Sequence, residues 1–161
     1  MRKTMIDLLQ QARVFEDLNT QEIAEVAKIS HKVTFKNGER ILEAETPARY
    51  LFIVGEGLVE LRFKVTLLGG TVEITIDQKF NGTSFGWSAL TEPYRYTLSA
   101  LAMRDTELIR IKANDIKRLC EQNNHLGFVV MKNIALIIGE RFGTIQNALI
   151  AEIQQNLKIK E

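Results

Sequence analysis

The pattern that most constrains this chain is a pair of neighbouring stretches in which apolar and polar residues alternate. Apolar residues occupy every second position from Val59 to Leu67, and the alternation returns from Val72 to Ile76 after Gly69-Gly70. A period of two places alternate side chains on opposite faces of a β-strand, and a glycine pair permits a tight turn. The pattern therefore predicts a β-hairpin whose apolar side chains share one face.

Further short β-type segments surround this hairpin. They are separated by turn residues such as Asn37-Gly38 and Gly55-Glu56-Gly57, and they lie at positions 33–35, 41–42, 50–54, 96–99 and 107–111. Many short strands with glycine turns between them are typical of a β-sandwich. Because helical patterns flank the strands, the expected fold class is mainly β with flanking helices (α+β). It would be a double-stranded β-helix, or jelly-roll sandwich, with N-terminal helices and a long C-terminal dimerisation helix.

The helical patterns divide the chain into three parts. A first helix is expected to end near Phe15, and Asn19 with Glu22 forms a capping-box pattern that starts a second one. Asn114-Asp115 is expected to open a short helix at 116–120. At 161 residues we expect one domain over 1–161, with N-terminal helices at 8–30, a β-roll at 32–112 and C-terminal helices at 114–157.

The last helical run, which reaches about Leu157, carries a stripe of apolar residues three or four positions apart. The stripe consists of Ile134, Ile138, Phe142, Ile145, Leu149, Ile153 and Leu157. Such a stripe predicts a seam between two copies of the helix, and Gly139 and Gly143 beside it would allow close backbone contact. The alternative is ordinary packing against the sandwich of the same chain. We expect a homodimer through this helix.

Composition excludes several function classes. The net charge is only +1, so nucleic-acid binding gains no support. The single cysteine, Cys120, forms no internal disulfide and suits a reducing compartment. Neither an N-terminal signal nor an apolar run of membrane-spanning length occurs, so the prediction is a cytoplasmic protein without membrane contact.

The central stretch, defined here as residues 81–102, interrupts the strands with a tight turn. Phe85-Gly86 is followed by one short helical turn at 87–90, and Pro93 leads toward a new strand at 96–99. A glycine that enters a short helix turns unpaired N–H groups toward one point. These donors and the positive end of the helix favour an anion.

The central stretch resembles the phosphate-binding cassette of cyclic nucleotide-binding domains, as in catabolite activator proteins and kinase regulatory subunits. The family pattern reads Phe-Gly-Glu-x-Ala-Leu, a short loop, and then Pro-Arg before a Thr-apolar-x-Ala segment. This chain keeps Phe85, Gly86, Ala89, Leu90, Pro93, Thr97, Leu98 and Ala100. It departs at two positions, because Trp87 replaces the ribose-binding glutamate and Tyr94 replaces the phosphate-binding arginine.

The resemblance implies a site for a small anionic ligand, with cAMP or cGMP as the possible cyclic nucleotides and no other cofactor. The candidate ligand-binding residues are Phe85, Gly86, Trp87, Ser88, Ala89, Tyr94, Arg95, Tyr96 and Thr97. The Ser88 and Ala89 amides would meet the phosphate. A bulge near Pro93 would let Arg95 replace the missing arginine, whereas without one it would be a solvated surface group. Trp87 would either stack on the ligand or fill the pocket.

Two function classes follow. The first is a regulatory sensor that binds a cyclic nucleotide or another small anion, and the alternative is a ligand-free relative that acts as a dimeric interaction module. An enzyme is not expected, since only His31 and His125 occur, and no nucleophile–base pair or metal-ligand spacing is present. Catabolite-activator relatives continue with a helix-turn-helix after the long helix. None follows here, so DNA binding by this chain alone is not expected.

Overall fold

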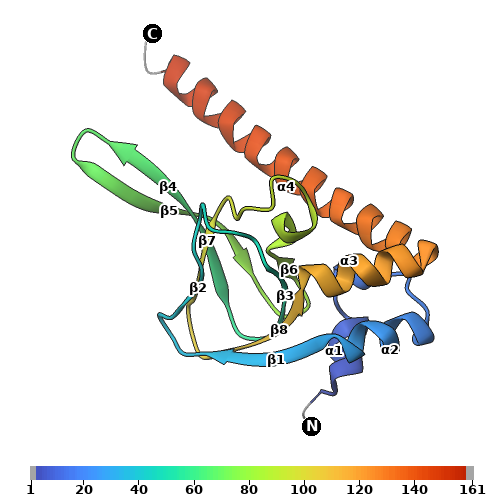
Figure 1. Cartoon of the computed structure of the whole chain (residues 1–161). Helices are drawn as coiled ribbons and strands as arrows, with labels where there is room; N and C mark the ends of the chain where they lie inside the picture. Colours follow the sequence, from blue (N-terminus) through green and yellow to red (C-terminus); the bar gives the residue numbers. More distant parts are fainter. Residues whose placement is uncertain (1–2, 159–161) are drawn as a thin grey trace.

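The computed structural model describes residues 3–158, and Figure 1 shows its helices and strands. In chain order the elements are α1 (Met5–Gln10), the 3₁₀ turn η1 (Arg13–Phe15), α2 (Thr20–Lys28), β1 (Ser30–Phe35), β2 (Arg40–Leu42), β3 (Tyr50–Glu56), β4 (Val59–Leu67), β5 (Gly70–Lys79), β6 (Ser84–Phe85), the 3₁₀ turn η2 (Trp87–Leu90), β7 (Ser99–Ala102), β8 (Thr106–Lys112), α3 (Ala113–Gln122) and α4 (Asn124–Lys158).

The strands form two four-stranded antiparallel sheets. One sheet has the order β1-β8-β3-β6, and the other has the order β2-β7-β4-β5. Side chains from both sheets, including Phe52, Leu61 and Leu108, meet in one buried cluster between them. The predicted jelly-roll sandwich with flanking helices is confirmed.

A second core lies between the first sheet and the helices. Leu51 and Ile53 of β3 join Ile109 and Ile111 of β8 in a cluster with buried residues of α1, α2, α3 and α4. Strand β3 is therefore buried on both faces, which explains its continuous apolar run at 51–54. Burying one such leucine or isoleucine contributes about 1.5–3 kcal/mol to folding.

The predicted hairpin is present as β4 and β5, but only part of its apolar face is buried. Its apolar face is buried at Val59 and Leu61, but Phe63 and Leu67 are 48% and 56% exposed. Strand β7 pairs with β4 only from Val59 to Arg62, and a bulge follows Leu61. Beyond that point the hairpin projects from the sandwich and has no second layer to cover it (Figure 1).

Three helix and strand boundaries also differ from the prediction. Helix α1 ends at Gln10, and η1 rather than continued α-helix reaches Phe15. Helix α3 begins earlier than expected, at Ala113. The strand expected at 96–99 starts only at Ser99, because the backbone of Tyr96 bonds to the loop before β3 instead, through Thr46 O at 3.0 Å and Glu45 N at 2.8 Å.

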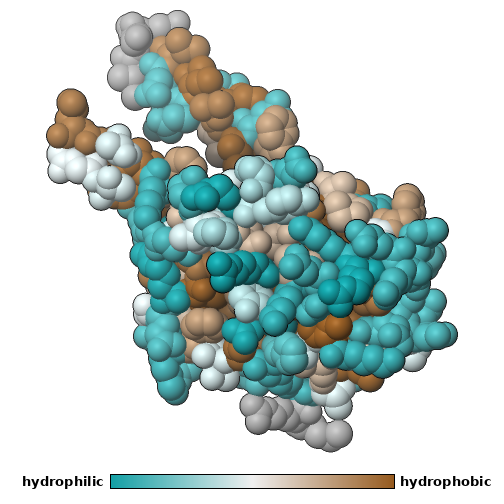
Figure 2. All heavy atoms as spheres, viewed as in Figure 1, coloured by the Kyte–Doolittle hydropathy of each residue, from teal (hydrophilic) through white to brown (hydrophobic). Residues whose placement is uncertain are grey.

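Helix α4 continues well past the sandwich (Figure 1). Its first part is buried at Leu126, Val130 and Ile134, whereas apolar residues of its second part are exposed. Figure 2 shows hydrophobic residues along this projecting part of α4 and at the tip of the β4–β5 hairpin. Among residues 3–158, no helix combines the length and the apolar character needed to cross a membrane. The predicted cytoplasmic location stays a prediction.

Helix α2 is held to the α3–α4 junction by one buried carboxylate. The predicted capping box is present, with Asn19 Oδ1 accepting from Glu22 N at 2.9 Å and Glu22 Oε2 accepting from Asn19 N at 3.0 Å. Glu22, only 4% exposed, also accepts hydrogen bonds from Asn123 Nδ2 at 3.1 Å and His125 Nδ1 at 2.8 Å. Burial is the largest single influence on the Glu22 pKa and raises it, but the hydrogen bonds from His125 and Asn19 outweigh burial and lower the pKa.

We expect Glu22→Gln to lower the free energy of unfolding by about 1–3 kcal/mol at neutral pH, because the buried charge is removed and one of its two acceptor oxygens becomes an NH2 donor. Glu25→Gln on the same helix removes only an exposed pair with Lys28 and should cost less than about 0.5 kcal/mol. The pKa of Glu22 is lowered in the folded state, so its stabilisation is present above the ordinary carboxyl pKa and is lost as pH falls through the lowered value. The free energies of unfolding of wild type and Glu22→Gln, measured by urea denaturation, should therefore converge as pH falls from neutral to about 3. A constant gap across this range would contradict the assignment.

Candidate functional site

The turn at Phe85-Gly86 is held against strand β3. Phe85 pairs with Phe52 in the sheet, and their rings stack with centroids 5.1 Å apart. Gly86 has φ 80° and ψ 18°, a left-handed conformation that favours glycine. A Cβ at this position would lie 2.8 Å from the carbonyl oxygen of Tyr50. The turn thus needs glycine for its conformation and for its close approach to β3.

The short turn η2 begins immediately after Gly86. The Ala89 N–H donates to Gly86 O at 3.0 Å, so one of the two amides expected to meet an anion is used inside the turn. The Trp87 and Ser88 amides precede this first bond and have no acceptor within the turn. The side chain of Ala89 is fully buried in the sandwich core.

A small cavity of about 20 Å³ lies beside η2 and is called the η2 cavity here. Its walls come from three strands, the central stretch and helix α4: Leu42, Leu61, Phe85, Gly86, Trp87, Ser88, Tyr96, Thr97, Leu98 and Arg141. This volume holds about one water molecule. Pockets that enclose drug-sized ligands measure about 300–1,000 Å³, so a nucleotide would have to widen the η2 cavity.

A larger cleft of about 200 Å³ lies next to the η2 cavity, between β5, β6 and α4. We call it the α4 cleft, and its charged lining residues are Arg13, Asp77, Lys79, Glu140 and Arg141. Arg13 and Glu140 form an ion pair. Arg141 lines both the α4 cleft and the η2 cavity.

Tyr96 anchors the central stretch to β3. Its hydroxyl donates to Tyr50 O at 2.9 Å and accepts from Tyr50 N at 3.0 Å. Burial raises the pKa of the Tyr96 hydroxyl, which keeps it neutral at physiological pH. Because its proton is already donated, Tyr96 contributes position and shape to the η2 cavity, together with its neighbour Thr97.

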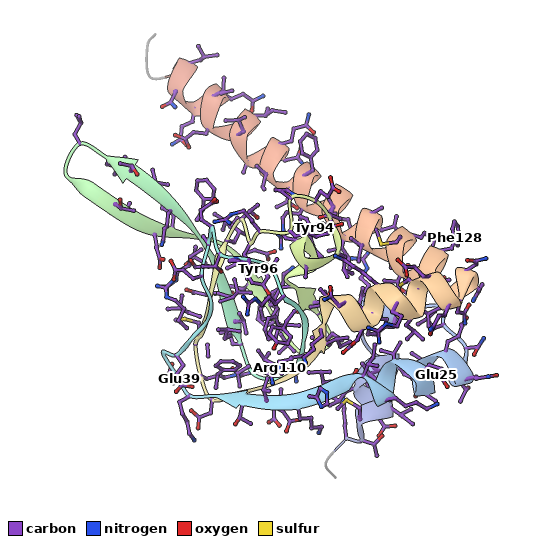
Figure 3. All side chains as sticks on the ribbon, in the orientation of Figure 1. Glu25, Glu39, Tyr94, Tyr96, Arg110 and Phe128 are labelled. Atoms are coloured by element: carbon purple, nitrogen blue, oxygen red, sulfur yellow. The ribbon has the colours of Figure 1, made fainter. Side chains whose placement is uncertain are left out.

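Tyr94 and Arg95 lie outside the η2 cavity. Tyr94 faces helix α3, where Lys117 Nζ lies 3.6 Å from the centre of its ring. The Arg95 guanidinium donates to the carbonyl oxygen of Glu45, and its backbone bridges to Pro47. Figure 3 labels Tyr94 and Tyr96 and shows them in the loop between η2 and β7. Neither Tyr94 nor Arg95 is therefore among the residues that line the η2 cavity.

Trp87 packs on the helical side of the site. It is half-buried against the core cluster formed by the helices, and it also lines the η2 cavity. The guanidinium carbon of Arg141 lies 5.6 Å from the centre of its ring, within the range of a cation–π contact. This position is compatible with both roles expected for Trp87, stacking on a ligand and filling the pocket.

Sequence reasoning missed Arg141. The residue follows Ile137 and Ile138, which pack against the helical core, by four and three positions. Positions separated by three or four residues share a helix face, so Arg141 had to point toward the sandwich. A charged residue on the packed face of an otherwise apolar helix was the signal that could have identified it.

We expect Gly86→Ala to destabilise the fold by about 2–4 kcal/mol, because a Cβ adds backbone strain and contacts the Tyr50 carbonyl. Gly38→Ala is the matched control, since Gly38 has φ 85° but a Cβ there would meet no atom within 4 Å. The control should cost only about 1–2 kcal/mol. Equal losses in chemical denaturation of the two variants would show that the approach to β3 is unimportant.

Comparison with known proteins identifies the family and the fold of this chain. Residues 32–123 match the model of the Cyclic nucleotide-binding domain family. A candidate cyclic nucleotide-binding protein from Geobacter metallireducens GS-15 is 29% identical, with a TM-score of 0.72 over 87% of this chain and 99% of that one. The catabolite activator protein of Thermus thermophilus is 25% identical, with a TM-score of 0.71 over 86% of this chain and 62% of that one.

Two further proteins are similar to parts of this chain. A regulatory subunit of a cAMP-independent protein kinase A from Trypanosoma brucei, in a mutant bound to cAMP, shares the fold at 17% identity, with a TM-score of 0.75 over 92% of this chain and 51% of that one. Glutaminase 1 of Bradyrhizobium diazoefficiens is 31% identical over 130 residues, which are 80% of this chain but a fifth of that enzyme. The match to the family model extends over more than half of the chain and includes the whole central stretch. The chain belongs to the cyclic nucleotide-binding domain family.

Proposed function

We propose that this chain is a regulatory domain that binds a small anionic ligand, cAMP or cGMP first among the candidates, beside η2. The observation that carries the proposal is that Trp87 and Ser88, at the start of η2, line one cavity together with Arg141, whose side chain is 16% exposed. Family membership supports the same function, as does the cAMP bound to the trypanosomal regulatory subunit of the same fold.

The departures at Trp87 and Tyr94 predict weak binding. An indole has no acceptor for a ribose hydroxyl, and Tyr94 lies outside the η2 cavity. Each lost hydrogen bond to a charged group costs about 1.5–3 kcal/mol, which is on the order of 10- to 100-fold in affinity. The ligand must also widen the η2 cavity, and the α4 cleft beside it offers the space.

Binding rather than catalysis is proposed for this chain. Among the described residues no group of three or more His, Cys, Asp and Glu side chains could hold a metal ion. Burial raises the pKa of the Cys120 thiol, which disfavours the nucleophilic thiolate. The glutaminase match covers a fifth of that enzyme and gives no reason to assign its activity here.

A second candidate, a ligand-free interaction module, is favoured by the small volume of the η2 cavity and by the indole that fills its edge. In this alternative the central stretch is only a structural part of the sandwich, and the chain acts through its exposed apolar surfaces. The two candidates differ in whether the protein responds to a cyclic nucleotide.

Calorimetric titration with cAMP and cGMP should give saturable binding with a dissociation constant on the order of 0.1 mM. Trp87 is the only tryptophan, so its fluorescence should change with the same midpoint. Absence of both signals up to about 10 mM of either nucleotide would reject the sensor and leave the interaction module.

We also propose that the projecting part of α4 pairs with a second copy of this chain. Phe142 and Leu149 are 66% and 59% exposed, and Ile145, Ile153 and Leu157 follow the same stripe. Glu152 is the only charged residue between positions 142 and 157, so the surface is unlike a solvated helix face. A Cβ at Gly139 or Gly143 would meet no described atom within 4 Å, which leaves room for a neighbouring backbone.

Sedimentation equilibrium should show a dimer of the wild-type chain. Leu149→Glu places a charge in the centre of the stripe and should weaken dimerisation by at least about 10-fold, since a buried unpaired charge is strongly unfavourable. Gln155→Glu introduces the same charge about 120° away around the helix, off the stripe, and should leave the dimer intact. A monomeric wild type, or equal effects of the two variants, would contradict pairing through this stripe.

A further inference from the structure

We propose that Arg141 of helix α4 binds the negative charge of the ligand, and that Asp77 of β5 competes for the same guanidinium. This inference rests on the proposed function, because it names the residue that replaces the arginine missing from the central stretch. It concerns a residue outside that stretch, on an element that the family pattern of the sequence did not include.

The geometry of Arg141 suits this role. Its side chain is 16% exposed and lines both the η2 cavity and the α4 cleft. Its Nη2 donates to Asp77 Oδ2 at 3.1 Å, whereas its buried Nε has no hydrogen-bond partner among the described residues. A guanidinium offers five donors in a planar fork that matches a phosphate, and a buried donor without an acceptor is unfavourable. Arg141 therefore has free donors for an anion, and an anion would satisfy its unpaired Nε.

Asp77 can release Arg141 to a ligand without losing all of its ion pairs. Asp77 also pairs with Lys79 Nζ at 2.9 Å, and the Lys79 side chain is only 12% exposed. If Arg141 turns toward a ligand, Asp77 keeps Lys79 as its counter-ion. Neither carboxylate nor ligand is then left as an unpaired buried charge, which is the usual obstacle to such exchanges.

The charges that line the two cavities sum to one positive charge. Arg13, Lys79 and Arg141 are cationic, and Asp77 and Glu140 are anionic. A cyclic nucleotide carries one negative charge on its phosphate, so its binding would neutralise the site. A ligand with several negative charges would leave an excess in a partly buried environment, which predicts preference for singly charged anions.

Trp87 and Arg141 act together in this arrangement. A glutamate at position 87 would pair with the guanidinium and neutralise it, whereas the indole presents a neutral face 5.6 Å from its carbon. Arg141 is the only charged residue in the described lining of the η2 cavity. With Trp87 in place of the family's glutamate, Arg141 stays available to an anion in the η2 cavity. Tyr94 and Arg95 supply no cation there.

The test compares cAMP with uncharged adenosine in wild type and in four variants. Arg141→Gln should weaken cAMP binding about 10- to 100-fold and leave adenosine binding unchanged, because only the charged ligand uses the guanidinium. Asp77→Asn should strengthen cAMP binding about 3- to 10-fold, since the competitor is removed. Arg118→Gln on the exposed surface of α3 makes the same change in net charge and should not alter either affinity.

Arg141→Lys is a second variant at this position, and it keeps the positive charge. Thermal melts of all variants report whether they are folded. Its affinity for cAMP should fall between those of wild type and Arg141→Gln, because a lysine lacks the planar fork. An equal loss of cAMP and adenosine binding in Arg141→Gln would overturn the inference, since it would indicate a structural role only.

The remaining outcomes separate the inference from the proposed function. If wild type binds cAMP and Arg141→Gln binds it equally well, the inference fails while the sensor stands. If cAMP binds Asp77→Asn but not wild type, the inference is supported and the sensor function of the unaltered chain fails. If cAMP binds neither protein, both proposals fail.

Discussion

The site depends on the close approach of the central stretch to strand β3. The Phe85 ring stacks on Phe52, Gly86 passes the Tyr50 carbonyl where a Cβ would not fit, and the Tyr96 hydroxyl bonds to both backbone groups of Tyr50. Strand β3 is itself buried on both faces. These contacts place η2 against β3, and Trp87 and Ser88 at its start line the η2 cavity.

Charge reaches this cavity from another part of the chain. Helix α4 packs across the sandwich through Leu126, Val130 and Ile134, and this packing brings Arg141 beside Trp87. The ion pair with Asp77 joins α4 to β5 at the same point. Ligand binding at Arg141 would exchange a contact between two elements for a contact with the ligand. The proposed sensor thus couples its ligand to the helix that carries the exposed apolar stripe.

Local patterns predicted much of the fold and part of the site. The capping box at Asn19 and Glu22, the buried strand at 50–54 and the turn at Gly86 all depend on neighbouring residues, and the structure has each of them. The exposure of Phe63 and the orientation of Tyr94 were not predictable in this way. The first depends on where β7 stops pairing with β4, and the second on a contact with Lys117 of α3.

Residue types and short-range spacing were enough to predict the sandwich, the glycine turn and the replacement of the family's acidic and basic residues at positions 87 and 94. The identity of the cation that lines the η2 cavity, by contrast, depends on how helix α4 packs on the sandwich. Arg95 lies next to Tyr94 in the sequence, but its guanidinium donates to Glu45 O. Arg141, which is far from the central stretch in the sequence, lines the η2 cavity. The physical reason is that the local secondary structure sets the direction of a side chain, whereas the packing of whole helices and strands sets which residue it meets.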